Sequence, residues 1–151
     1  MERPAVRQVE FRVVRDVGRP DEVVPLVDGA RLDELVGRYE RTRGYEPAGG
    51  YGGLVPAYGN LGDLADHLGG GTRRWWSRDR HVALLACDCG EVGCWPLEAE
   101  VVVTDDRVTW SGFRQPHRPA WDYDGFGPFT FARDQYDAAA VVAAERVHGG
   151  G

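Results

Sequence analysis

Three strand-like segments follow one another between residues 81 and 110, with only short turns between them. The run from His81 to Cys87 is almost entirely apolar, as expected for a strand that is covered on both faces. Beyond a turn rich in cysteine and glycine, apolar and acidic residues alternate, and Asp105-Asp106 then turns the chain into a partner strand. The inner face of these two later strands is predicted to hold Ala99, Val101, Val103, Val108 and Trp110. Strands joined this closely pair with their neighbours, which predicts a mainly antiparallel sheet.

Helical patterns and one further strand pair surround this sheet. The segments Val9 to Val13 and Val23 to Val27 read as paired strands. Three helices are predicted from apolar residues at helical spacing. The first has Leu32, Leu35, Val36 and Tyr39 on its inner face. The second, capped by Asn60, has Leu61, Leu64, Ala65 and Leu68, and the third, capped by Asp134, has Tyr136, Ala140, Ala143 and Val147. The sequence therefore predicts an α+β fold, a mainly antiparallel sheet with two or three packed helices.

Length and charge narrow the range of functions. The 151 residues suit one α+β domain, predicted to span residues 1–148, with a disordered glycine tail at residues 149–151. A net charge of -6 disfavours nucleic acid as a partner. The first residues lack the pattern of a signal peptide, and no apolar run is long enough to cross a membrane. We therefore expect a cytoplasmic protein without a membrane partner, whose thiols stay reduced.

Two segments rich in glycine, proline and aromatic residues are predicted to be long loops. The first, residues 44–59, includes backbone N–H groups at residues 48–53 that could face an anion, but it lacks the Lys-Ser/Thr of a phosphate loop. The second, residues 111–129, is stiffened by prolines and carries the residue types found at interface hot spots. Its predicted ligand- or partner-binding residues are Gln115, His117, Arg118, Trp121 and Tyr123. The alternative is that its aromatic side chains fold back and cover an edge of the sheet. A basic and aromatic cluster at residues 73–78 is the one candidate for contact with nucleic acid.

All the cysteines of the chain, Cys87, Cys89 and Cys94, lie within eight residues. A bend at Gly90 would let their thiols converge on a zinc ion, with His117 as the candidate fourth ligand and His81 or Asp88 as weaker ones. Two alternatives remain open. The cysteines could pack as small buried hydrophobic residues, or they could perform redox or nucleophilic chemistry. The acidic neighbours argue against a catalytic thiol, because negative charge raises a thiol pKa.

The stretch from Leu84 to Tyr136 contains three distinctive sequence words. They are CDCGEVGCWPL, VTWSGFRQPHRPAWDY and GFGPFTFARDQY, preceded upstream by PAGGYGGLVPA. In these words the chain resembles an uncharacterised family of small bacterial proteins from GC-rich genomes, marked by a CxCGxxGCWPL turn and a QPHRPxWDY loop. A GC-rich genome also explains why every basic residue is Arg and why the chain has no Lys. The resemblance implies no established activity and no catalytic residue. Where other members favour an acidic cap before the last helix, this chain has Ala132.

The favoured interpretation is a cytoplasmic binding or interaction module. Its cysteine turn would scaffold the loop from Gln115 to Tyr123, with structural zinc as the candidate cofactor and a protein or small molecule as the partner. The alternative is a thiol- or metal-dependent enzyme, resembling an oxidoreductase, that uses the cysteines with His117. The sequence leaves open whether the protein catalyses any reaction.

Overall fold

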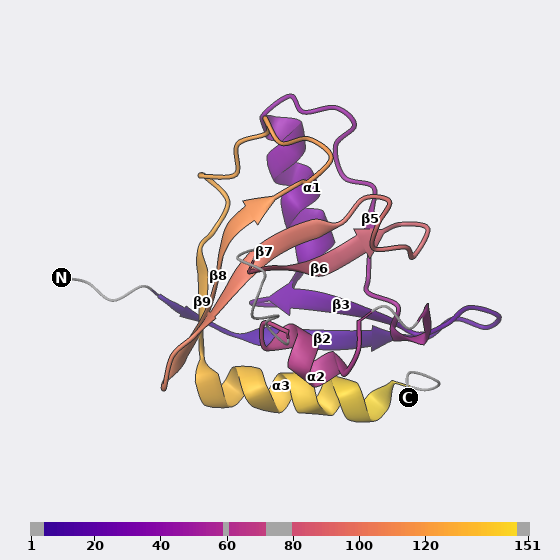
Figure 1. Cartoon of the computed structure of the whole chain (residues 1–151), viewed down its shortest axis with the longest axis vertical. Helices are drawn as coiled ribbons and strands as arrows, with labels where there is room; N and C mark the ends of the chain where they lie inside the picture. Colours follow the sequence, from indigo (N-terminus) through magenta and orange to yellow (C-terminus); the bar gives the residue numbers. More distant parts are fainter. Residues whose placement is uncertain (1–4, 59–60, 72–79, 148–151) are drawn as a thin grey trace.

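The part of the chain that the structure describes folds into two sheets and three helices (Figure 1). The computed structural model describes residues 5–58, 61–71 and 80–147. Its strands are β1 (Val6–Arg7), β2 (Val9–Val14), β3 (Glu22–Val27), β4 (Ala30–Arg31), β5 (Tyr51–Gly52), β6 (His81–Cys87), β7 (Leu97–Val103), β8 (Arg107–Arg114) and β9 (Phe129–Ala132). Its helices are α1 (Leu32–Thr42), α2 (Leu64–Leu68) and α3 (Arg133–Arg146), with a 3-10 turn at Pro56–Tyr58. The predicted α+β class is confirmed.

The larger sheet has six strands in the order β1-β9-β8-β7-β6-β5, and every pairing in it is antiparallel except that of β1 with β9. The smaller sheet pairs β2 with β3 and β3 with β4, all antiparallel. In Figure 1, α3 runs along β2 at the bottom of the view and α1 stands above β3; α3 contacts β2, and α1 contacts β3 and β4. Within the described residues, no helix is long and apolar enough to cross a membrane.

An aromatic cluster fills the core where β2, the larger sheet and α3 meet. The ring of Phe11 meets that of Tyr136 edge-on at 5.3 Å between centroids, and Trp110 meets Phe131 at 4.8 Å. Edge-to-face pairs at these distances add to the stabilisation from burial alone. The polar ends are also satisfied, because Trp110 Nε1 donates to the Tyr136 hydroxyl at 3.0 Å and that hydroxyl donates to the Leu68 carbonyl. The predicted inner-face residues Ala99, Val101, Val108 and Trp110 are buried.

Several sequence-based expectations are wrong in detail. Val103 is exposed, because β7 runs past the edge of the core before the turn at Asp105-Asp106. The predicted loop 111–129 is shorter, since β8 continues to Arg114 and β9 begins at Phe129. Pairing of β9 with both β8 and β1 outweighs the weak strand pattern of its short sequence.

Two helices begin at other residues than predicted. Helix α2 starts at Leu64, and the Asp63 carboxylate accepts a hydrogen bond from the Asp66 backbone N–H as its cap. Helix α3 starts at Arg133, so Asp134 lies in its first turn, and Ala132 occupies the cap position without a side-chain bond. Asn60, the cluster at residues 73–78 and the tail at residues 149–151 lie outside the described residues.

Candidate metal centre and binding loop

The cysteine turn connects β6 to β7 and is fixed by its own backbone. The Gly90 N–H donates to the Cys87 carbonyl at 2.8 Å, and the Cys87 N–H donates to the Glu91 carbonyl at 3.2 Å. Gly90 has a φ of 95°, which favours glycine strongly over other residues. A Cβ at this position would also lie 2.8 Å from a ring carbon of Tyr58. The bend predicted at Gly90 is therefore present, and a residue with a side chain would be strained in it.

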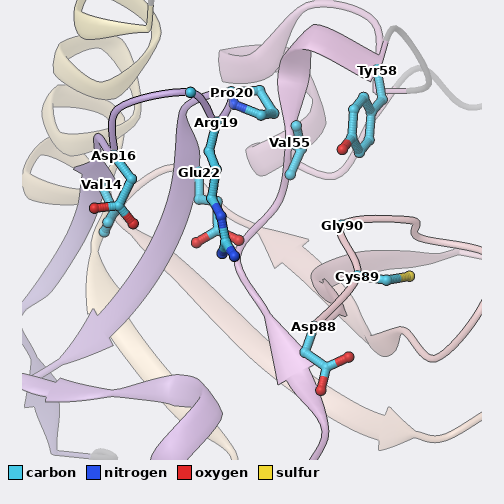
Figure 2. Close-up of a pocket in the computed structure, with 11 residues that line it drawn as sticks. Val14, Asp16, Arg19, Pro20, Glu22, Val55, Tyr58, Asp88, Cys89 and Gly90 are labelled. Carbon is cyan, nitrogen blue, oxygen red and sulfur yellow. The ribbon is translucent and has the colours of Figure 1, made fainter.

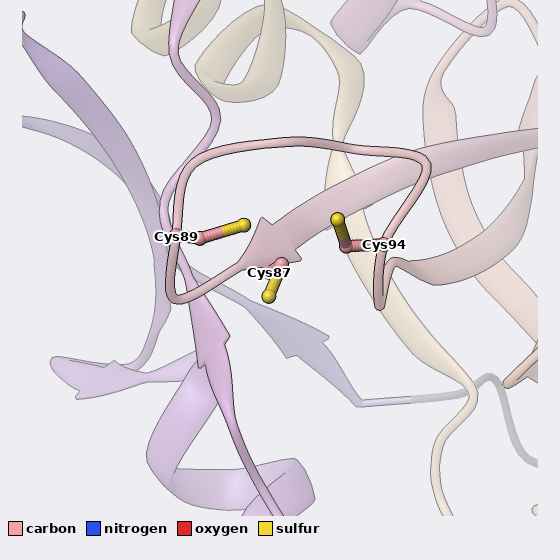
Figure 3. A group of neighbouring side chains, drawn as sticks. All are labelled: Cys87, Cys89 and Cys94. Atoms are coloured by element: carbon pink, nitrogen blue, oxygen red, sulfur yellow. The ribbon is translucent and has the colours of Figure 1, made fainter.

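The turn brings the three thiols together. Their sulfur atoms all lie within 4.8 Å of one another. Figure 3 shows Cys89 and Cys94 approaching from opposite sides of the turn, with Cys87 between them. Thiolates around a tetrahedral zinc ion, at about 2.3 Å from the metal, are about 3.8 Å apart, so each pair needs to close by at most about 1 Å. The cluster fits zinc with small side-chain rotations.

The three cysteines are more exposed to solvent than core residues are. Cys89 and Cys94 are exposed, and Cys87 is half-buried. The expectation that the cysteines pack as buried hydrophobic residues is therefore wrong for Cys89 and Cys94. The glycine-rich turn extends beyond the end of β6 and leaves these two side chains at the surface. A free cysteine buried for its packing would be covered.

The three thiols differ in how readily they lose a proton. Burial raises the pKa of the Cys87 thiol to about 11. The hydrogen bond to Cys89 raises the pKa of Cys94, whereas the Glu91 backbone N–H and then Cys87 lower the pKa of Cys89. The predicted effect of acidic neighbours holds for Cys87, whose thiol donates to the Asp88 carboxylate at 3.5 Å, but backbone donation dominates at Cys89. Cys89 is thus the first candidate for a thiolate ligand.

His117 lies next to the cysteine turn but does not join the thiol cluster. Its Nε2 shares a hydrogen bond with the Gly93 carbonyl at 2.9 Å, and its ring stacks on Trp95 with 6.2 Å between centroids. His81 is also held elsewhere, by the Gly112 carbonyl. Among the residues that the structure describes, no His, Asp or Glu ligand atom lies within 4.8 Å of all three sulfurs. The predicted four-ligand set with His117 is therefore not assembled in this arrangement.

Two of the predicted binding residues support the loop from within. Gln115 is only 1% exposed, and its side-chain N–H groups donate to the Pro96 carbonyl at 2.9 Å and to the Tyr51 hydroxyl at 3.1 Å. Its side-chain oxygen accepts from the His117 backbone N–H. Tyr123 is also buried. Gln115 ties the loop to the segment after the cysteine turn, and Tyr123 ties it to Glu40 of α1.

Beneath the loop lies a buried carboxylate that sequence reasoning missed. Glu40 of α1 is 0% exposed, and its carboxylate accepts hydrogen bonds from the Tyr51 hydroxyl at 2.6 Å, the Tyr123 hydroxyl at 2.5 Å and the Gly49 N–H at 2.8 Å. The pKa of each tyrosine is raised above the ordinary value of a tyrosine, mainly by burial and secondly by the hydrogen bond to Glu40. Both hydroxyls therefore keep their protons and remain donors. One side chain of α1 therefore joins both glycine- and proline-rich loops.

Above this network, five side chains form a continuous layer that we call the ledge: Tyr45, Trp95, His117, Arg118 and Trp121. Tyr45 stacks on Trp121 at 4.7 Å between centroids, with only 8° between the ring planes. The Arg118 guanidinium carbon lies 5.0 Å from the Trp95 ring centroid and 5.9 Å from that of Trp121. Arg118 and His117 are exposed, and the three aromatic residues of the ledge are half-buried. The loop thus presents rigid aromatic surface together with a positive charge.

A cleft lies on the other side of the cysteine turn. It has a volume of about 350 Å³ and lies between the β2–β3 turn, which supplies Arg19, and the segment Asp88–Gly90. Figure 2 shows the Cys89 thiol pointing away from Arg19 and Glu22 in this cleft. The cleft therefore borders the turn along Asp88, Cys89 and Gly90, and the Cys89 sulfur points away from its opposite wall.

No protein-family model, no curated protein and no solved structure matches the chain.

Proposed function

We propose that this protein is a binding module in which Cys87, Cys89 and Cys94 hold a zinc ion that stiffens the ledge for a partner. The observation that carries the proposal is the convergence of three sulfurs within 4.8 Å on a turn bonded directly to the loop. Thiolate ligands select soft or borderline metals, and zinc is the commonest of these in structural sites. Cys89 and Cys94 are exposed, so an ion can reach them from solvent.

Three contacts would transmit order from the metal to the ledge. The Gly93 carbonyl, one residue before Cys94, binds His117, and Trp95, one residue after it, stacks on the same ring. Next to Trp95, the Pro96 carbonyl accepts from the buried Gln115. Fixing Cys94 on a metal therefore restrains residues on both sides of it, and a restrained loop binds its partner at a lower entropic cost.

The partner we propose is a protein segment with acidic and aromatic or proline residues. Trp, Tyr and Arg are the residue types that dominate interface hot spots. Arg118 supplies a positive charge on a chain whose net charge is -6, so it is a local attraction point for an acidic group. We also propose a cytoplasmic location, where the thiols stay available for metal, and membership of the small bacterial family that the three sequence words resemble.

Cobalt substitution tests the metal site. We expect Co²⁺ to bind and to give thiolate charge-transfer bands together with the visible bands of a tetrahedral ion, and we expect Cys89→Ser to lose much of both. His117→Ala is the matched control: its spectrum should equal that of the wild type, because His117 is held by Gly93. Absence of cobalt binding by the wild-type protein would reject the site.

Hydrogen exchange tests whether the metal orders the ledge. Removing the metal with a chelator should accelerate exchange of the amides at residues 115–121 and leave those of α3 unchanged, because only the former contact the turn.

Partner capture tests the binding surface. A protein recovered from the native extract by the wild type and by Arg12→Ala, but not by Arg118→Ala or Trp121→Ala, would support the ledge as the binding surface. Equal recovery by all four would refute it.

A metal- or thiol-dependent enzyme is the second candidate, and two observations favour it. Within the described part of the chain three sulfurs converge without a fourth ligand, which is the pattern of sites that keep a position for a substrate. The pKa of Cys89 is also lowered. This candidate predicts that an added small ligand such as azide changes the cobalt spectrum, whereas the structural site predicts no change.

A further inference from the structure

The cleft between α1 and the glycine segment that follows it is lined by two arginines. It has a volume of about 420 Å³ and is lined on the helix side by Arg38 and Arg41 and on the loop side by Ala48, Gly49 and Gly50. The two arginines are three residues apart and so lie on one face of the helix. Across the described ranges, neither guanidinium group forms an ion pair or a hydrogen bond.

The wall opposite the arginines is held rigidly. The Gly49 N–H donates to Glu40 at 2.8 Å, and the Gly49 carbonyl accepts from Trp95 Nε1 at 2.8 Å. Helix and loop also approach closely: a Cβ on Gly37 would lie 3.6 Å from the Cα of Gly49 and 3.3 Å from Nη1 of Arg41. Because this wall is already ordered, binding a ligand there carries no entropic cost for ordering it.

The glycine segment resembled an anion loop in the sequence, but the Gly49 N–H is already used by Glu40. The charged donors in the lining of the cleft are the guanidinium groups of Arg38 and Arg41. Guanidinium forks match phosphate oxygens in pairs, and two of them balance the charge of a phosphate monoester better than that of a single carboxylate.

The remaining acidic residues of the cleft favour a ligand that also carries hydroxyl groups. Asp33 is occupied by Arg31, which contacts it at 3.1 Å. Glu34, by contrast, makes no ion pair or side-chain hydrogen bond within the part of the chain that the structure describes. Its carboxylate can accept hydrogen bonds but repels a bare anion. A volume of about 420 Å³ also suits a small organic ligand.

We propose that this cleft binds a small hydroxyl-bearing phosphate monoester. Arg38 and Arg41 hold the phosphoryl group, and Glu34 accepts hydrogen bonds from the hydroxyl groups of the organic part. The proposal does not depend on a metal at the cysteine turn, so either can fail without the other.

Ribose 5-phosphate, inorganic phosphate and ribose are the probes, each titrated into the full-length protein and followed by calorimetry and by the amide NMR signals of residues 34–50. We expect ribose 5-phosphate to bind more tightly than inorganic phosphate by about fivefold or more, since only the former offers sugar hydroxyl groups to Glu34. Ribose should not bind measurably. Equal affinity for the two phosphates, or no binding of ribose 5-phosphate, overturns the proposal.

Variants assign the residues. The double variant Arg38→Gln/Arg41→Gln should bind ribose 5-phosphate more weakly by roughly tenfold or more, since hydrogen bonds between charged partners are lost. Arg12→Gln/Arg107→Gln changes the net charge equally at sites outside the cleft and should bind as the wild type does. Glu34→Ala should reduce the preference for ribose 5-phosphate over inorganic phosphate without weakening the binding of inorganic phosphate. Arg38→Lys keeps the charge and the fold but lacks the fork, so it should also bind more weakly.

The assignment is overturned if the Arg38/Arg41 double variant binds ribose 5-phosphate as tightly as the wild type does. It is also overturned if the Arg12/Arg107 double variant loses as much affinity as the Arg38/Arg41 double variant. Unfolding curves of each variant, recorded in urea, confirm that any lost binding comes from a folded protein.

Discussion

Replacement of the buried Glu40 by glutamine is the sharpest test of how the two loops are held. Glu40 accepts three hydrogen bonds, from two tyrosine hydroxyls and one backbone N–H, in a site without solvent exposure. Glutamine has the same shape, but only its oxygen can accept. At least one of the three donors must therefore lose its acceptor or rotate.

The size of the effect follows from this count. A buried donor left without a partner costs about 1–3 kcal/mol, and the bonds lost here were made to a group able to carry charge. Removing a buried carboxylate recovers part of that cost, because a neutral amide is cheaper to bury. We expect Glu40→Gln to lower the free energy of unfolding by about 1–3 kcal/mol, and Glu40→Ala, which abandons all three donors, to cost more.

Urea unfolding at neutral pH measures the change, and hydrogen exchange locates it. Exchange should accelerate at residues 49–51 and 115–123, which the network joins, before it does in β7 and β8. Glu145→Gln, an identical substitution at an exposed position of α3, should stay within about 0.5 kcal/mol of the wild type. If Glu40→Gln also stayed within that range and left exchange unchanged, the three bonds would not be stabilising the loops.

Two further predictions concern the cysteine turn and pH. Gly90→Ala should lower the free energy of unfolding by about 1–3 kcal/mol and weaken cobalt binding, because of its φ of 95° and the 2.8 Å contact with Tyr58; Gly93→Ala, where a Cβ would meet nothing within 4 Å, should change neither. Burial lowers the pKa of His67 in the folded state, so the unfolded chain takes up the proton first and stability should fall as pH drops below about 6.5. That fall should be smaller in His67→Gln, and an equal fall in both proteins would show that another group is responsible.

Periodicity predicted the parts of this fold that depend on neighbours in the chain. The β2–β3 pair, the inner faces of β7 and β8 and the buried face of α3 all follow from alternation or helical spacing in a short window. The convergence of the cysteines could also be anticipated, because Gly90 and their spacing lie within one turn.

The failures have a different origin. Glu40 occupies the buried stripe of α1, four residues after Val36 and eight after Leu32, and that position was the available signal. Nothing local identifies its partner Tyr123, which is 83 residues away. The same limit applies to Gln115 and His117, whose roles depend on contacts with the segment from Gly93 to Pro96. Of the side chains predicted to face a partner, Gln115 and Tyr123 are buried and support the loop from within.

Metal content of the native, untagged protein tests the central proposal most directly. Elemental analysis after purification without chelator, together with a count of reactive thiols, should find stoichiometric zinc and thiols that become reactive only when a chelator removes it. Cys89→Ser should lose most of the metal. A metal-free protein with three freely reactive thiols, which also fails to take up added zinc, would contradict the account.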